Sequence, residues 1–124
     1  MNKEYYIELS QRLMKTKWFK WMPGMATYTP VPYTSPHLGR ILSGEDDIFH
    51  LWREDTIPNL RDPATLGCLL FLVRKAWEMP TGIVVSYSSD DGLWGVSWSG
   101  ATHGDWCGRG KTEAEALVVS LENL

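Results

Sequence analysis

Apolar residues recur at helical spacing in three parts of the chain. In the first part, Tyr6, Leu9 and Leu13 lie three or four residues apart with polar residues between them, which places them on one face of a helix. Asn2 stands just before this pattern, and asparagine is a preferred N-cap residue. The pattern therefore predicts a helix over residues 3–16.

The longest helical pattern lies in LRDPATLGCLLFLVRKAWEMP, residues 60–80. Asp62 is suited to the N-cap, Pro63 to the first helical position, and Pro80 to the end of the helix. One face carries Leu66, Leu69, Leu70, Val73 and Trp77. The other side carries Cys68, Phe71 and Leu72, of which Cys68 is expected to be a small core residue. A helix that is apolar nearly all round is either covered on both sides within the monomer or part of an oligomer contact.

The chain closes with the segment KTEAEALVVSLENL, which predicts a third helix. Thr112 and Glu115 have the spacing of a capping box, in which each side chain accepts a hydrogen bond from an otherwise unpaired backbone amide. The apolar residues after them recur on one face, namely Ala114, Leu117, Val118 and Leu121.

Alternating apolar residues predict a β-hairpin over residues 82–98, with turn residues between its strands at Ser89–Asp90–Asp91–Gly92. A third strand is expected around 102–107, although its glycines weaken the pattern. Residues 22–39 hold several prolines, which withhold backbone donors, so this part is expected to be loop or at most a short edge strand. Two more short strands are expected at 38–42 and 48–53.

Helices and strands in this order indicate an α+β fold, in which an antiparallel sheet with a β-hairpin is packed by about three helices in a sandwich. A length of 124 residues is that of one ordinary domain, so residues 1–124 are expected to form a single domain. The net charge of −3 argues against general nucleic-acid binding and against binding to an anionic membrane. The longest uncharged apolar run, residues 64–73, is too short to span a bilayer.

The sequence offers little catalytic or metal-binding chemistry. His103 and Cys107 are four residues apart, but no second pair accompanies them, so no metal site and no cofactor are expected. The acidic pairs Asp46–Asp47 and Asp90–Asp91 fall in predicted turns, where aspartate bonds to its own backbone. No nucleophile elbow, P-loop or dinucleotide fingerprint is present, and the chain is expected not to be an enzyme.

One segment, Gly108–Arg109–Gly110–Lys111–Thr112, leads into the N-terminus of the last predicted helix. Such helix ends attract anions through unpaired amides and the helix dipole. Arg109 and Lys111, together with Arg61, are therefore candidate phosphate-binding residues. The alternative is a glycine-hinged loop with two ordinary surface cations.

Tryptophan is abundant, with seven residues, and its placement suggests two roles. Trp77, Trp94 and Trp98 lie in regular patterns and are expected in the core. The segment WFKWMPGM, residues 18–25, places bulky apolar side chains around a Pro-Gly turn, where they either pack on the core or contact a partner. The candidate partner-binding residues are Trp18, Trp21, Met22, Met25 and Trp106.

Several segments together resemble a group of small proteins that phages and prophages encode. These segments are DPATLGCLLFLVRKAWEMP, the hairpin with LWGVSW, the closing TEAEALVVSL and the turn at 18–25. In layout the chain is similar to the phage alpha-beta-alpha sandwich domains. The group has no established activity, so the resemblance implies a phage accessory protein that acts in the cytoplasm of the host bacterium.

The leading hypothesis is a non-enzymatic protein that antagonises a host process, an antiviral defence above all, by binding a host protein. The alternative is a homo-oligomer that sequesters a small nucleotide signal, with tryptophan stacked on its bases and Arg61, Arg109 or Lys111 on its phosphates. An enzyme such as a small nucleotide hydrolase and a structural or assembly component of the phage particle are further alternatives.

Overall fold

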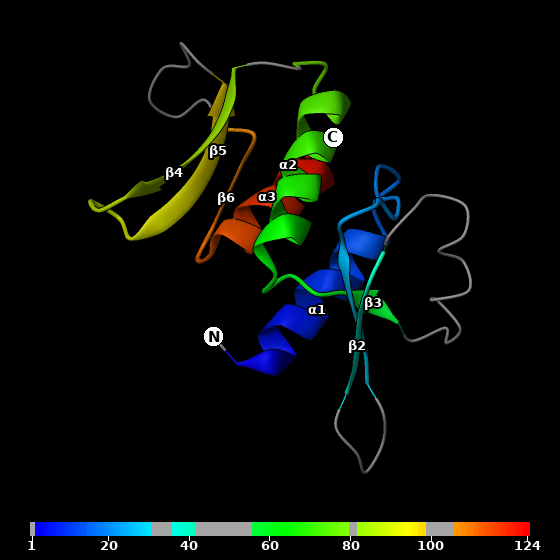
Figure 1. Ribbon diagram of the computed structural model, residues 1–124. Helices are drawn as coiled ribbons and strands as arrows, with labels where there is room; N and C mark the ends of the chain where they lie inside the picture. The colour runs from blue at the N-terminus through cyan, green and yellow to red at the C-terminus, as the bar shows by residue number, and fades with distance from the viewer. Residues whose placement is uncertain (1, 31–35, 42–55, 80–81, 99–105) are drawn as a thin grey trace.

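A computed structural model describes residues 2–30, 36–41, 56–79, 82–98 and 106–124 of the chain. Within these ranges it contains three helices and two three-stranded antiparallel sheets, so the expected α+β class is confirmed (Figure 1). The expected strand at 48–53 lies outside the described residues, as do His103 and Trp52. No helix among the described residues has the length and apolar character needed to cross a membrane.

The three helices are α1 (Lys3–Met14), α2 (Pro63–Ala76) and α3 (Glu113–Glu122). The N-caps are those that the sequence predicts: the side chains of Asn2, Asp62 and Thr112 each accept a hydrogen bond from a backbone amide of the first helical turn. The capping box of α3 differs in one detail. Glu115 accepts a bond from the backbone N–H of Lys111, at 2.9 Å, one residue before the expected amide of Thr112.

The first sheet contains β1 (Ala26–Thr29), β2 (His37–Arg40) and β3 (Ile57–Pro58), in the order β2-β1-β3. The expectation that residues 22–39 form loop or an edge strand is therefore wrong for β1, which is the central strand. Pro23 and Pro30 flank β1 without entering it, so all four of its residues keep the amides that a central strand needs. Pro58 does lie within a strand, at the edge of the sheet, where a missing donor is tolerated.

The second sheet contains β4 (Ile83–Ser88), β5 (Leu93–Trp98) and β6 (Gly108–Gly110), in the order β4-β5-β6. The predicted hairpin is confirmed. Of the third strand expected at 102–107 only residues 106 and 107 are described, and they precede β6 without being part of it. Gly108 and Gly110 do not interrupt this strand. A Cβ atom on Gly108 would lie 2.5 Å from the backbone nitrogen of Ser120, so glycine is what allows β6 to approach α3.

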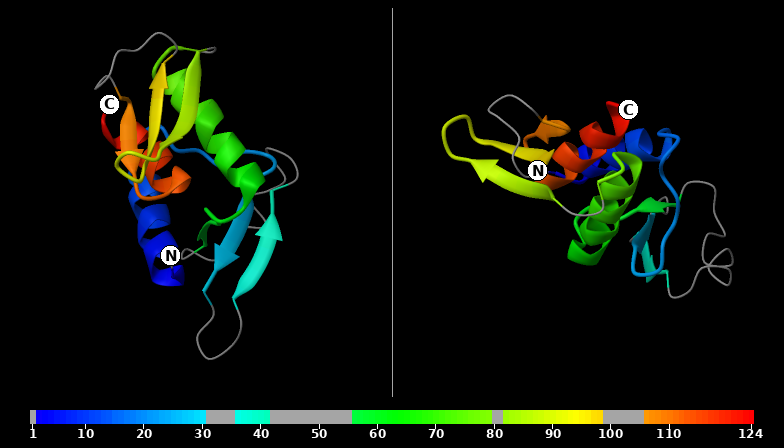
Figure 2. Two further views of the ribbon diagram at one scale, coloured as in Figure 1. Left: turned by 90° about the vertical axis from the view of Figure 1, so that its left-hand side faces the viewer. Right: turned by 90° about the horizontal axis from the view of Figure 1, so that it is seen from above.

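Helix α3 lies at the centre of the structure, between the second sheet and the other two helices (Figures 1 and 2). The apolar residues of α3 pack with those of α1 and α2 in one continuous core. The buried residues of α3 are Ala114, Ala116, Leu117, Val118, Ser120 and Leu121. Helix α2 is covered on the face that carries Leu69 and Val73, whereas Phe71 is 51% exposed. The apolar character of α2 is thus only partly explained by burial within one chain.

A polar network holds the first sheet against the start of α2. Arg40 donates two hydrogen bonds to the carboxylate of Asp62, at 2.8 and 3.0 Å, and a third to the carbonyl of Gly24 at 2.7 Å. The hydroxyl of Thr65 bonds to Asp62 and accepts the backbone N–H of Ala26 at 2.8 Å. The carboxylate of Asp62 therefore caps α2, pairs with Arg40 of β2, and orders Thr65, whose hydroxyl binds the first amide of β1.

Replacing Asp62 should lower stability in a pH-dependent way. The hydrogen bonds from Arg40, together with those from Thr65, lower the pKa of Asp62 from 3.8 to about 2. The unfolded chain therefore binds more protons than the folded one between these values, and the contribution of Asp62 is complete above about pH 5 and is lost as the pH falls toward 2. We expect Asp62→Asn to lower the free energy of unfolding by about 1 kcal/mol at pH 7, because asparagine can still cap α2 but loses the charge that pairs with Arg40.

Denaturant unfolding of both proteins at pH 7, 4 and 2.5 checks this expectation, since the difference between them should shrink as the pH falls. Asp90→Asn is the matched control, because Asp90 is exposed and forms no ion pair with a described residue. A difference for Asp62→Asn that stays constant over this pH range would show that the carboxylate is not held by Arg40 in solution.

Candidate protein-binding surface

Three neighbouring clefts form one continuous surface at the end of the molecule where the three helices have their C-termini. Their volumes are about 240, 210 and 340 Å³. Trp18 lines the first and second, and Lys75 lines the second and third, so the clefts adjoin one another. The Trp18 surface, as we name it, consists of Arg12, Lys15, Thr16, Lys17, Trp18, Phe19, Lys20, Phe71, Leu72, Arg74, Lys75, Ala76, Glu78, Leu121, Glu122 and Leu124.

The directions of the helices explain why these residues meet. All three helices run toward the upper right in Figure 1, and the view from above in Figure 2 also places their C-terminal ends close together. Lys15 is the C-cap of α1, and Arg74 and Lys75 lie in the last turn of α2. Helix C-termini carry partial negative charge, which favours cations at these positions.

The Trp18 surface is strongly basic although the whole protein is acidic. It carries six of the twelve lysine and arginine residues, but only two of the fifteen acidic ones. Arg12 is paired with Glu122 at 2.6 Å. Lys15, Lys20 and Lys75, by contrast, form no ion pair with any residue that the structure describes.

Two aromatic side chains give this basic surface an apolar part. Trp18 is 36% exposed, and the ammonium group of Lys17 lies 5.2 Å from the centre of its ring. Phe71 projects from α2 and is 51% exposed. Leu72 and Ala76 of α2 form the floor of the second cleft, which Trp18 and Phe19 also line. Exposed tryptophan within a ring of cations is typical of protein interfaces.

The Pro-Gly turn of residues 18–25 is divided between the core and the surface. Met25 is completely buried, so its predicted role as a partner contact is wrong: the turn folds it inward beside Leu69 and Ile41 in the core. Trp21 and Met22 are half-buried and pack against the core. Trp18, before the turn, is the predicted contact residue that stays at the surface.

Trp106 lies on another face of the molecule. Its ring covers Gly95, where a Cβ atom would come within 2.3 Å of it. Gly95 alternates along β5 with Val96, which is buried in the core, so the ring lies on the other face of the second sheet. The guanidinium group of Arg109 lies 5.0 Å from the ring centre and also pairs with Asp91. This pairing, led by the hydrogen bond from Arg109, lowers the pKa of Asp91. The structure therefore does not bring Trp106 together with Trp18.

The three candidate phosphate-binding cations are also not gathered into one site. Arg109 is engaged by Asp91, and Lys111 is exposed beside the acidic first turn of α3, which contains Glu113 and Glu115. The guanidinium carbon of Arg61 lies 4.9 Å from the centre of the Tyr6 ring, in a cleft that neither Arg109 nor Lys111 lines.

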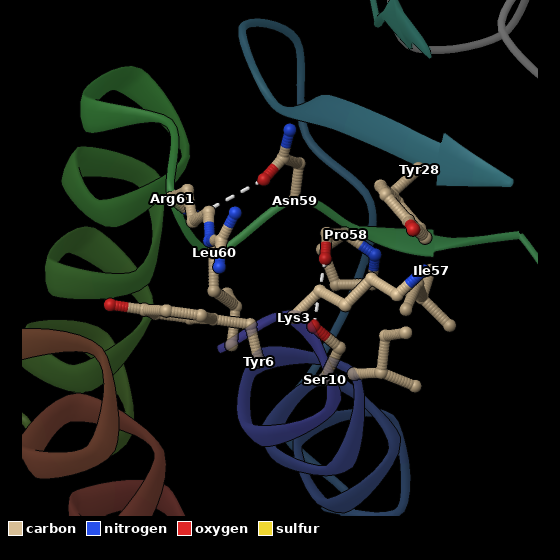
Figure 3. Close-up of a pocket in the computed structure, with 10 residues that line it drawn as sticks. Lys3, Tyr6, Ser10, Tyr28, Ile57, Pro58, Asn59, Leu60 and Arg61 are labelled. Carbon is tan, nitrogen blue, oxygen red and sulfur yellow. Dashed lines mark hydrogen bonds between the residues drawn. The ribbon is translucent and has the colours of Figure 1, made fainter. Parts of the chain in front are cut away.

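Arg61 lines two cavities of very different size. The one in Figure 3 measures about 30 Å³, room for a water molecule, and the hydroxyl of Ser10, which lines it, donates a hydrogen bond to the carbonyl of Pro58. The other is an open cleft of about 410 Å³ between Arg61, Tyr6, Trp94 and the start of α3. Its volume falls within the range of small-molecule sites.

Metal chemistry has no support among the described residues, which contain no cluster of three potential ligands. Cys107 is buried, and this burial raises the pKa of its thiol, so it behaves as a packing residue. Cys68 is only half-buried, against the Pro-Gly turn, with its thiol 3.6 Å from the carbonyl of Pro23.

Comparisons with known proteins give no relative for this chain. No protein-family model matches it, no curated protein sequence matches it significantly, and no solved structure does so either. The resemblance to phage-encoded proteins therefore stays a prediction.

Sequence reasoning missed most of the Trp18 surface because its residues come from separate segments. The strongest local signal was KTKWFKW, residues 15–21, in which lysines alternate with aromatic residues. The contribution of Phe71 and Lys75 depends on how α2 is oriented. No periodic pattern gives that orientation for a helix that is apolar nearly all round.

The two tryptophans of the turn should respond differently to truncation. Trp21 is half-buried, with its ring 5.4 Å from that of Phe19 in an edge-to-face contact, so Trp21→Ala should cost about 2 kcal/mol of unfolding free energy. Trp18→Ala removes an exposed ring and should cost less than about 0.5 kcal/mol. Denaturant unfolding of both variants checks this, and equal losses would mean that Trp18 is part of the core in solution.

Proposed function

We propose that this protein works by binding another protein, and that the Trp18 surface is where the partner docks. The observation that carries the proposal is an exposed tryptophan among lysines that have no ion-pair partner in the described structure, on a chain whose net charge is −3. Tryptophan and arginine are the residues most enriched at interface hot spots. Charge complementarity would speed association and select the partner.

The chemistry of the surface specifies the partner: an acidic segment that carries one aromatic or aliphatic anchor. The anchor would enter the cleft formed by Trp18, Phe19 and Leu72. Aspartate or glutamate on either side of it would reach Lys17, Lys20 or Lys75. A partial ring of cations around an apolar floor fits such a segment better than it fits a polyanion, which would be expected to contact a mainly polar, basic groove.

The biological setting is supported by the resemblance to phage-encoded proteins alone. On that basis the partner is a host protein in the bacterial cytoplasm, and binding antagonises a host process such as an antiviral defence. A non-enzymatic mode of action agrees with a described surface that offers cations and aromatic rings rather than paired acid and base.

A second candidate function is the sequestration of a small nucleotide. It is favoured by the open cleft of about 410 Å³, where Arg61 could hold a phosphate and Tyr6 or Trp94 could stack on a base. Arg109 and Lys111 do not line this cleft. Of the three candidate phosphate-binding residues the cleft contains Arg61 alone, and we therefore place this function second.

Peptides selected from a random library on the wild-type protein test the proposal. We expect the selected peptides to combine aspartate or glutamate with one aromatic or aliphatic residue. The double variant Lys17→Glu/Lys75→Glu should bind them at least about tenfold more weakly, because two attractions become repulsions. Trp18→Ala should cause a similar loss through the removal of a hot-spot side chain. Fluorescence anisotropy with labelled peptides measures both effects.

The matched control is Lys3→Glu/Lys111→Glu, which makes the same change in net charge at exposed positions near the N-terminal ends of α1 and α3. It should leave peptide affinity unchanged. Equal losses of peptide affinity in both double variants would show that the change in net charge, and not the position of the lysines, weakens binding. A single-stranded oligonucleotide that binds through Lys17 and Lys75, while no acidic peptide does, would make the surface a nucleic-acid site and contradict the proposal.

A further inference from the structure

Strand β4 (Ile83–Ser88) stands out among the sheet edges that the structure describes. The other three edge strands are short, and each contains a charge or a proline: β2 has Arg40, β3 has Pro58 and β6 has Arg109. These are the features with which proteins protect edges from pairing. The sequence of β4, IVVSYS, is six residues long and has neither.

The hydrogen bonds of the second sheet show which backbone groups of β4 point outward. The carbonyl of Val96 accepts the N–H of Cys107 at 2.7 Å, so the polar groups of Val96 face β6. Val85 lies opposite Val96 in the hairpin, and its own N–H and C=O must therefore point away from β5. The groups of Ile83 and Tyr87, two residues to either side, point the same way. Arg74 confirms this for Ile83, since it donates to the Ile83 carbonyl at 2.9 Å.

Val85 and Tyr87 thus present two donors and two acceptors along an open edge. Among the described residues, no hydrogen bond outside the hairpin uses these groups. The left view of Figure 2 draws α2 on the side of β4 away from β5, and its hydrogen bond to this edge is the one from Arg74 to the carbonyl of Ile83, at the start of the strand. The side chains beside this edge are also exposed, with Val84 at 46% and Tyr87 at 53%.

We propose that β4 pairs with β4 of a second copy of this chain, antiparallel, about a twofold axis that passes beside Ser86. In this register Val85 pairs with Tyr87 of the second copy, and Tyr87 with Val85 of the second copy. Each pair exchanges two N–H···O=C bonds. The two sheets become one continuous six-stranded sheet, and the twofold axis makes the contact closed. The Ile83 carbonyl, already bound by Arg74, is left undisturbed.

Charge complementarity supports a second copy as the occupant. Antiparallel pairing in this register brings the hairpin turn of one copy beside the start of β4 in the other copy, where Arg74 lies; Asp91 of this turn is paired with Arg109, and Asp90 supplies the negative charge. Opposite charges therefore meet at both ends of the contact. At its centre two uncharged serines face each other, so no like charges are opposed.

The inference shares Arg74 with the proposed docking surface but does not depend on it, because the edge consists of the backbone groups of Val85 and Tyr87. It does give a specific form to the expected homo-oligomer, which the sequence placed at the apolar helix of residues 64–73. The contact is assigned here to β4 instead, on the basis of its unpaired backbone groups.

A cysteine placed beside the axis tests the register directly. Opposed residues of a non-hydrogen-bonded antiparallel pair have Cα atoms about 4.5 Å apart, within the range of about 4.4–6.8 Å that disulfides span. Ser86→Cys should therefore give a disulfide-linked dimer under mild oxidation, seen on a non-reducing gel. Ser88→Cys is the matched control on the same strand, displaced from the axis, and should not do so. Both variants keep Cys68 and Cys107, so the native thiols are controlled for.

Sedimentation of the full chain at high micromolar concentration completes the test. The wild type and Ser86→Thr should show twice the mass of one chain, and Ser86→Lys, which opposes two like charges at the axis, should show the mass of one. A monomeric wild type would overturn the proposal and leave the edge to a strand of another protein. A dimeric Ser86→Lys, or equal cross-linking of the Ser86→Cys and Ser88→Cys variants, would overturn it by placing the contact elsewhere.

Discussion

The carboxylate of Asp62 makes the contact on which the first half of the structure depends. It caps α2, accepts two hydrogen bonds from Arg40 of β2, and orders Thr65, whose hydroxyl holds the first amide of β1. A short three-stranded sheet has little core of its own, so it needs such a connection to a helix. With β1 fixed in this way, the Pro-Gly turn before it is fixed as well.

The fixed turn explains how one aromatic segment serves both packing and exposure. Met25 is drawn into the core beside the anchored strand, and Trp21 packs at its margin. Trp18 lies on the far side of the turn, next to the end of α1, and stays accessible. The same arrangement brings Lys17 and Lys20 beside α2, where they meet Lys75. The docking surface thus combines the irregular segment of residues 15–20 with side chains from the C-terminal parts of the three helices.

The parts of this structure that could be predicted from the sequence are those determined locally. Helix caps depend on one side chain and an amide three residues away, and the hairpin depends on alternation and on its turn, so Asn2, Asp62 and Thr112 were all assigned correctly. The central place of β1 was missed because proline density was averaged over residues 22–39, whereas pairing depends on the four residues between the prolines. The strand at Gly108–Gly110 was missed because its glycines are required by the close approach of α3, and no local sequence pattern predicts that contact.

The candidate sites show the same division. The tryptophan-rich turn was recognised, yet which of its side chains would be buried depended on the tertiary contact with β2 and α2. The surroundings of the candidate phosphate-binding residues also come from tertiary contacts, because Arg109 pairs with Asp91 and Arg61 stacks on Tyr6. A basic surface within an acidic protein is likewise invisible in the net charge. It emerges only when three helix ends are brought together.

The most direct test of the central claim is an NMR titration of the labelled protein with an acidic peptide that carries one apolar anchor. The account predicts amide shift changes at residues 15–20 and 71–78, with little change around Tyr6, Arg61 and Trp94. Changes concentrated at those last three residues would instead identify the open cleft as the binding site and would contradict the assignment of the Trp18 surface.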